Sequence, residues 1–259
     1  LVARSDVTRA IEGPGRVRAT GNVLLGDFTD NRGFDVGRID VSFRDVVLLD
    51  RDRARLYDGV STIDGGRLRT TAGLLIDQNA ELSGHGTIDG ELVNRGVVEG
   101  AGAGLVLNGP VSGAGDWLGT IVFNGLFEPG NSPAQLRMGS PDFRQWVRME
   151  LAGLTPGAFD QLRIDGQAQL AGTLEVILLD GFQPALGDRF ELLRAIEFGE
   201  LNGAFDDIRL PELVGGLDWQ VAQSSRGLAL EVVPEPATLA LLAAGGGLVI
   251  GRRRPRERG

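Results

Sequence analysis

Few side chains in this sequence could carry out catalytic chemistry. Apart from one histidine, all 26 basic residues are arginines, and there is no cysteine. Schiff-base chemistry on lysine, thiol nucleophiles, disulfides and Cys/His zinc sites are therefore excluded. His85 lies between Gly84 and Gly86, and the sequence places no serine nucleophile or acidic partner with it. We expect a surface turn residue there rather than a general base.

Carboxylates are the remaining candidates, because polysaccharide-degrading enzymes work with pairs of acidic residues. The closely spaced pairs are Asp27 with Asp30, Asp50 with Asp52, and Asp206 with Asp207. Neither an EF-hand nor a tandem calcium repeat is present, so we expect solvated turn aspartates. The sequence thus predicts no catalytic residue, no metal site and no cofactor. A β-helix polysaccharide lyase or glycosidase with an acidic groove stays open as an alternative.

A different kind of site lies near the end of the chain. Residues 237–250 form a run of fourteen uncharged, largely apolar residues, and Arg252, Arg253 and Arg254 follow. A helix of this length spans about 21 Å. It crosses a ~30 Å hydrocarbon core only if the flanking residues extend the helix. We predict one transmembrane helix whose arginines keep that end in the cytoplasm. A buried C-terminal helix is the alternative, which the glycines at 245–247 disfavour.

The residues just before this run are Pro234, Glu235 and Pro236. Two prolines around one glutamate favour an extended backbone. The order of Pro-Glu-Pro, apolar helix and arginine cluster resembles the PEP-CTERM sorting signal of Gram-negative bacteria. The resemblance implies that an exosortase, a membrane-embedded enzyme, recognises Pro-Glu-Pro and cuts near it. Anchoring in the inner membrane without processing is the alternative.

The charge of the chain is unevenly distributed. The net charge is −9, yet the residues from 234 onward hold five arginines and two glutamates, so the body is more acidic than the whole. An acidic body repels phosphate backbones, and we expect no nucleic-acid partner. The first ten residues lack the charged start and apolar core of a secretory signal, so we also expect an incomplete N-terminus.

The body before Pro234 predicts an all-β fold. Short segments alternate apolar and polar residues between glycines and asparagines, without a sustained helical period. The clearest buried faces are Val147, Met149 and Leu151; Leu174, Val176 and Leu178; Phe190 and Leu192; and Leu228, Leu230 and Val232. Each set predicts a strand with one face in the core.

Between residues 80 and 133 the sequence also repeats itself. Residues 82–86 return at 111–115, 29 residues on, and residues 94–100 return at 124–130, 30 residues on. Such a period suits one coil of a β-solenoid, in which asparagines at equivalent corners stack as hydrogen-bonded ladders. With the turn at residues 130–133, this part resembles the glycine-rich parallel β-helix passengers of autotransporter-like proteins.

These features predict three regions. Residues 1–140 would form a parallel β-helix or solenoid, residues 141–233 a β-rich cap or small β-sandwich, and residues 234–259 the sorting signal with its transmembrane helix. Larger aromatic residues would fill the second core, namely Phe143, Trp146, Phe159, Phe182, Phe190, Phe198, Phe205 and Trp219. A cap would cover the strand edges that an open solenoid end exposes.

Together these predictions describe a non-enzymatic, exported protein of the cell envelope or extracellular matrix. Its precursor would be held in the inner membrane, and its partners would be an exosortase-type sorting enzyme and exopolysaccharide in a biofilm. A surface adhesin that binds another protein is a further alternative.

Overall fold

The computed structural model describes residues 12–19, 23–25, 35–41, 46–49, 54–130 and 133–235, with side chains from residue 54 onward. Every regular element in this part of the chain is a β-strand, which confirms the all-β prediction. The predicted transmembrane helix at residues 237–250 lies outside the described residues. Among those described, no helix is long and apolar enough to span a bilayer.

The strands range from three to seventeen residues and are closely spaced along the chain. The first ten are β1 (Glu12–Ala19), β2 (Val23–Leu25), β3 (Asp35–Val41), β4 (Val46–Leu49), β5 (Ala54–Thr70), β6 (Leu74–Asp89), β7 (Leu92–Asn94), β8 (Val97–Leu107), β9 (Val111–Gly113) and β10 (Asp116–Phe123). The others are β11 (Leu126–Pro129), β12 (Gln135–Phe143), β13 (Trp146–Leu151), β14 (Gln161–Ile164), β15 (Gln167–Leu170), β16 (Thr173–Leu178), β17 (Arg189–Ala195), β18 (Glu200–Gly203), β19 (Asp207–Arg209), β20 (Leu217–Ser224) and β21 (Gly227–Pro234).

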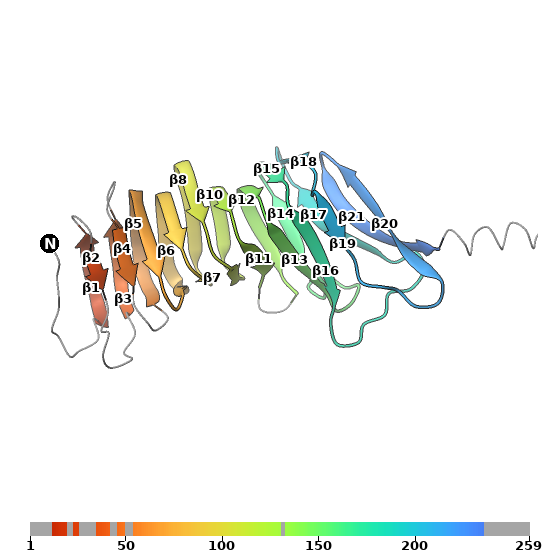
Figure 1. Cartoon of the computed structure of the whole chain (residues 1–259), viewed down its shortest axis with the longest axis horizontal. Coiled ribbons are helices and arrows are strands. Elements are labelled where there is room, and N and C mark those ends of the chain that lie inside the picture. The colour runs from red at the N-terminus through yellow and green to blue at the C-terminus, as the bar shows by residue number, and fades with distance from the viewer. Residues whose placement is uncertain are drawn as a thin grey trace, which may run out of the picture.

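Parallel pairing links most of these strands into three ladders. The first runs from β1 through β3, β5, β6, β7, β9, β11, β13 and β16 to β19. The second joins β1, β3, β5, β6, β8, β10, β12, β14 and β17. The third joins β2, β4, β5, β6, β8, β10, β12, β15 and β18. Figure 1 shows the resulting row of strands along the long axis of the molecule.

The long strands take part in more than one ladder. Each passes from one ladder to the next at the point where the pairing register shifts. In β8, Gly100 pairs with Gly119 of β10, whereas Leu105 pairs with Ile121. A Cβ atom on Gly119 would lie 2.0 Å from the carbonyl oxygen of Gly100, and Gly119 has a φ of +64°. Glycine is therefore required at this bend both for the close approach of the two backbones and for the left-handed conformation.

The C-terminal end of the row is built differently. β21 pairs antiparallel with β17 on one side and with β20 on the other. Residues 225 and 226 connect β20 to β21, so these two strands form a hairpin. The parallel ladders thus give way to an antiparallel end, where the chain also leaves the described structure (Figure 1).

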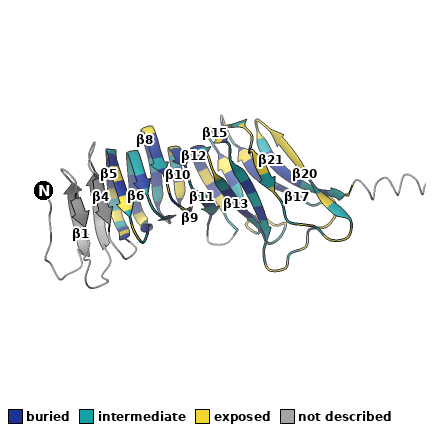
Figure 2. Cartoon of the chain, viewed as in Figure 1, coloured by how far each residue is buried: buried dark blue, intermediate teal, exposed yellow. Residues whose placement is uncertain are grey.

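The core lies between the ladders and follows the alternation of each strand (Figure 2). On β13, Val147, Met149 and Leu151 are fully buried while the residues between them face outward. The same alternation buries the predicted faces of β16, β17 and β21, except that Leu178 is half-buried. Extended backbone places successive side chains on opposite faces, so the pattern identified these strands correctly.

The predicted repeat period is wrong as a guide to strand register. Ser83 and Ser112, 29 residues apart, were expected at equivalent positions, but Ser83 pairs with Thr62 and Glu99, whereas Ser112 pairs with Val93 and Glu128. The two serines therefore lie on different ladders. Similar glycine-rich turns end strands of every ladder, so a recurrence of turn residues does not measure the distance between stacked strands.

The expected boundary near Ser140 falls inside β12. This strand continues from Gln135 to Phe143, and Ser140 and Pro141 pair with Thr120 and Ile121 of β10. The division into residues 1–140 and 141–233 stays a prediction.

The large aromatic residues are not confined to the later part of the chain. Trp117, Phe123 and Phe127 are almost fully buried and form a cluster with Phe143. Phe198, which was predicted to lie in the core, is 92% exposed. It belongs to the turn between β17 and β18, so the strand alternation that would bury it does not extend to its position.

Candidate sorting site

The described part of the predicted sorting motif begins within β21. The apolar residues of this strand face the core, where Leu228, Leu230 and Val232 are at most 1% exposed. The connecting turn is held by Arg226, whose guanidinium donates hydrogen bonds to the carbonyl oxygens of Gly199 (2.5 Å) and Ala195 (3.3 Å). The position of β21 is therefore fixed both by its buried face and by the turn that precedes it.

Pro234 and Glu235 stand where β21 ends. Pro234 forms the last pair of the hairpin, opposite Leu217. The backbone N–H of Glu235 donates to the carbonyl oxygen of Gly216 at 2.9 Å, while the Glu235 side chain is exposed. The first two residues of Pro-Glu-Pro are thus placed by backbone pairing and leave one carboxylate in solvent.

Val232 links the motif to the turn that precedes β17, on the other side of β21. Its N–H donates to the carbonyl oxygen of Asp188, and its own carbonyl oxygen accepts from the N–H of Gly187, both at 2.9 Å. Its side chain is 1% exposed. On this second edge of β21, backbone pairing therefore continues to Val232, two residues before Pro234.

A surface cavity of about 350 Å³ opens beside Glu235. Trp219 forms part of its wall and donates from Nε1 to the carbonyl oxygen of Pro211 at 2.9 Å. The residues that line the cavity are Leu210, Pro211, Glu212, Leu213, Leu217, Asp218, Trp219 and Glu235. This lining includes three carboxylates and no basic side chain, so the surface beside the motif is acidic.

Several predicted site residues lie outside the described part of the chain. They are Pro236 of the Pro-Glu-Pro element, the topology residues Arg252, Arg253 and Arg254, and the aspartates Asp27, Asp30, Asp50 and Asp52. Of the predicted motif, the structure therefore places Pro234 and Glu235.

The other predicted chemical candidates have structural contacts. Asp206 accepts a hydrogen bond from the backbone N–H of Gly172 at 2.7 Å, and Asp207 forms an ion pair with Arg209 at 2.9 Å. The prediction that His85 lies in a turn is wrong: it lies within β6, with Nε2 3.7 Å from a carboxylate oxygen of Asp64 on the neighbouring strand, and its side chain is 41% exposed. Asp206 and Asp207 each bind a different neighbour rather than converging on one groove. The described residues hold no group of three or more acidic, His or Cys side chains suited to a metal ion.

Asp160 is the residue that the sequence analysis missed. It is fully buried, and its two carboxylate oxygens accept backbone N–H bonds from Ala134 (2.6 Å) and Glu150 (2.7 Å). Burial raises the pKa of Asp160 to about 7, although the two N–H donors act to lower it. No sequence signal distinguishes it from the surface aspartates, because its burial depends on strands far along the chain.

Asp160 borders a second cavity, of about 230 Å³, which also contacts Ser112, Glu128 and Glu150. Burial and the charge of Glu128 raise the pKa of Glu150. Arg148 spans this surface, with ion pairs to Glu128 (2.5 Å) and Glu175 (2.7 Å). Because each oxygen of Asp160 accepts a backbone N–H, this buried carboxyl links the residue before β12 to β13.

Comparison with known proteins identifies the C-terminal segment. A family model described as PEP-CTERM protein-sorting motif matches residues 232–254. None of the curated proteins compared with the chain matches it. The matched residues include the Pro-Glu-Pro element and the arginine cluster, and such a motif implies an exported, membrane-anchored precursor that an exosortase sorts. The chain therefore carries a PEP-CTERM protein-sorting motif, whose first residues form the end of β21.

Proposed function

We propose that this chain is a non-enzymatic structural protein of the cell envelope or extracellular matrix, delivered there by its sorting motif. The observation that carries the proposal is the direct continuity between β21 and the motif, which begins at residue 232 inside the strand. The all-β body is therefore the cargo that the motif delivers.

We also propose that the body is a β-solenoid of the kind found in autotransporter-like passengers. Three ladders of parallel pairing support this architecture, because strands of one ladder stack directly upon one another at about 4.8 Å. The antiparallel β20–β21 hairpin would then serve as its C-terminal cap. A capped solenoid is a long, stiff object, which suits a structural role in a matrix.

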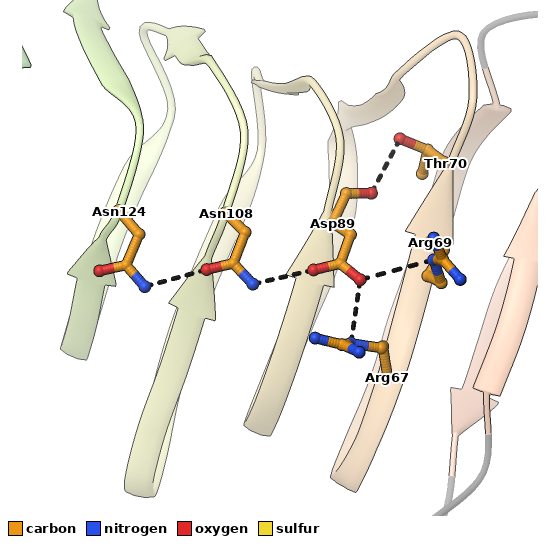
Figure 3. Close-up of polar contacts among 6 residues, drawn as sticks. All are labelled: Arg67, Arg69, Thr70, Asp89, Asn108 and Asn124. Carbon is orange, nitrogen blue, oxygen red and sulfur yellow. Dashed lines mark hydrogen bonds and ion pairs between the residues drawn. The ribbon is translucent and has the colours of Figure 1, made fainter.

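Exopolysaccharide is the proposed partner of this body. Parallel ladders repeat polar groups at the spacing of the strands, as in the row formed by Asn124, Asn108 and Asp89 (Figure 3). Arg148 with Glu128 and Glu175 forms a second such row on neighbouring strands. A surface that repeats polar side chains on successive strands suits a ligand that is itself a repeating polymer.

Sorting is tested in the host by intact-mass and C-terminal peptide analysis of the protein from inner-membrane, envelope and extracellular fractions. We expect a shortened form without Arg252–Arg254 outside the inner membrane. Glu235→Ala should cause the full-length chain to accumulate in the inner membrane. Glu212→Ala is the matched control, because Glu212 is also exposed and lines the same cavity. A wild-type chain that keeps its arginines in every fraction would contradict sorting by cleavage.

The polysaccharide partner is tested with the mature protein recovered from the host. We expect it to co-sediment with the host exopolysaccharide, to be displaced by soluble fragments of that polymer and to leave the polymer length unchanged. Shortening of the polymer would instead favour a lyase or glycosidase. Capture of a protein partner that polysaccharide does not compete away would favour an adhesin.

A further inference from the structure

The sorting motif and the folded body overlap in sequence. The matched segment begins at residue 232, whereas β21 ends at Pro234, so the first residues of the motif are also the last residues of a sheet. An enzyme that cuts within or beside Pro-Glu-Pro therefore meets a substrate that is already folded on its N-terminal side.

Backbone hydrogen bonds enclose β21 on both edges. β20 pairs with it from Gly227 to Pro234, and the pairing with β17 covers Gly227 to Glu231. The bonds of Val232 to Asp188 and Gly187 extend this second edge, and the bond from Glu235 to Gly216 closes the first. A peptide-cutting enzyme generally binds its substrate as an extended segment, and an extended segment uses the same backbone groups that β21 has already committed.

Removing β21 from the sheet would also open the core. Leu228, Leu230 and Val232 are at most 1% exposed, so the fold removes all three apolar side chains from water. Withdrawal of the strand would expose all three and would leave the edges of β17 and β20 unpaired. Cleavage upstream of Pro234 thus requires partial unfolding of the domain, whereas cleavage after Glu235 does not break this pairing.

We infer that the folded body limits where the sorting enzyme can cut: the cleaved bond lies C-terminal to Glu235, and the mature protein keeps the whole of β21. This inference rests on the proposed sorting by cleavage and narrows its position. In the reaction the acyl carbon before the cut exchanges its bond to the amide nitrogen for a bond to water or to an amine acceptor. The nitrogen released with the tail takes up the proton.

The first arm of the test measures the enclosure of β21 without the sorting enzyme. The purified full-length chain, kept in detergent micelles, is digested briefly with a protease of broad specificity. The C-terminus of the resistant fragment is then identified from its mass by mass spectrometry. We expect its C-terminus at Glu235 or later. A resistant fragment that ends before Glu235 would show that β21 is not protected and would overturn the inference.

The second arm locates the cut made in the host, from C-terminal peptides of the mature protein. A mature end at Glu235 or beyond is expected, and an end at Pro234 or earlier would refute the limit. A chain that keeps Arg252–Arg254 in every fraction would instead show that no sorting cut occurs. That outcome overturns the proposed function and the inference with it, and the retained arginines distinguish it from a misplaced cut.

A pair of leucine substitutions links protection to folding. Leu230→Asp places a charge at a fully buried position of β21, whereas Leu186→Asp makes the same change at a position that is 61% exposed beside the strand. We expect the first variant to give cuts upstream of Glu235 in both arms and the second to give the wild-type ends. Unchanged ends in a Leu230→Asp chain shown to be unfolded would overturn the inference.

Discussion

Asn124 and Asn108 form a direct link between neighbouring strands, because the side-chain N–H of Asn124 donates to Oδ1 of Asn108 at 2.9 Å. Asn108 in turn donates to Oδ1 of Asp89 at 2.8 Å, and Arg67 pairs with the second oxygen of that aspartate at 2.9 Å (Figure 3). The asparagines expected at equivalent corners, Asn94 and Asn124, do not stack on each other: Asn124 bonds Asn108, whereas the side chain of Asn94 bonds the backbone of Gly96 and Asp116. The row ends in an ion pair, so its terminal acceptor is charge-compensated.

Removing the middle of this row should destabilise the stacking of β8 between β6 and β10. Asn108→Ala deletes two hydrogen bonds at an exposed position, and we expect a loss of about 1 kcal/mol in the free energy of unfolding. Urea denaturation followed by circular dichroism measures it. Asn79→Ala is the control, because Asn79 is exposed on β6 and has no side-chain hydrogen bond within the described structure. Equal effects of both substitutions would contradict a role for the row.

The buried carboxyl of Asp160 should make stability depend on pH. Its pKa in the folded state is about 7, above the ordinary value of 3.8, so the folded state holds this proton more tightly than the unfolded state. The stability that this group contributes is complete below about pH 4 and is lost as the pH rises through 7. We expect the free energy of unfolding to fall by roughly 1–4 kcal/mol across this interval.

Asp160→Asn separates this effect from the other titrating groups. The amide keeps the size of the carboxyl and does not ionise, so the decline between pH 4 and pH 7 should become shallower. Urea denaturation at pH 4, 5.5 and 7 for both proteins gives the comparison. A variant whose stability falls as steeply as that of the wild type would assign the pH dependence to other residues.

Backbone crowding at the bends of the long strands gives a third prediction. Gly119 and Gly102 have similar φ angles, +64° and +56°, but a Cβ on Gly102 would meet nothing within 4 Å. Gly102→Ala should therefore cost about 1–2 kcal/mol from the left-handed conformation alone. Gly119→Ala adds the contact with the Gly100 carbonyl and should lower the unfolding midpoint considerably further. Similar midpoints for the two variants would show that the bend can relax.

Features that depend on interactions between residues close in the sequence could be predicted, whereas features that depend on distant segments could not. Alternation along a strand is local, so the buried faces of β13 and β21 could be predicted from residues such as Val147 and Leu230. The Pro-Glu-Pro element is also local, and its match was found where expected. The strand partners of Ser83 lie 16 or more residues away, and the N–H donors to Asp160 lie 10 and 26 residues away, in segments whose register no local pattern encodes.

The overlap of β21 with the sorting motif could be recognised only from the sequence pattern and the backbone pairing together. The sequence predicted a buried face that includes Val232 and a motif that starts with Pro234, but it did not show that backbone pairing continues to Glu235. That continuity comes from the hydrogen bond between Glu235 and Gly216, which lie on opposite sides of the hairpin. The limit on the sorting cut is therefore a property of the fold.

The two contrasting aromatic positions provide a final test of where the core lies. Phe127 is fully buried and packs against Phe123 and Phe143, with ring centroids 4.7 and 5.6 Å away, whereas Phe198 is 92% exposed. Phe127→Ala removes a ring from a packed interior and should lower the free energy of unfolding by about 3–5 kcal/mol. Phe198→Ala makes the same change in solvent and should stay within about 0.5 kcal/mol of the wild type. Urea denaturation measures both, and a large loss for Phe198→Ala would show that this ring is covered in solution, because truncating an uncovered side chain removes no packing.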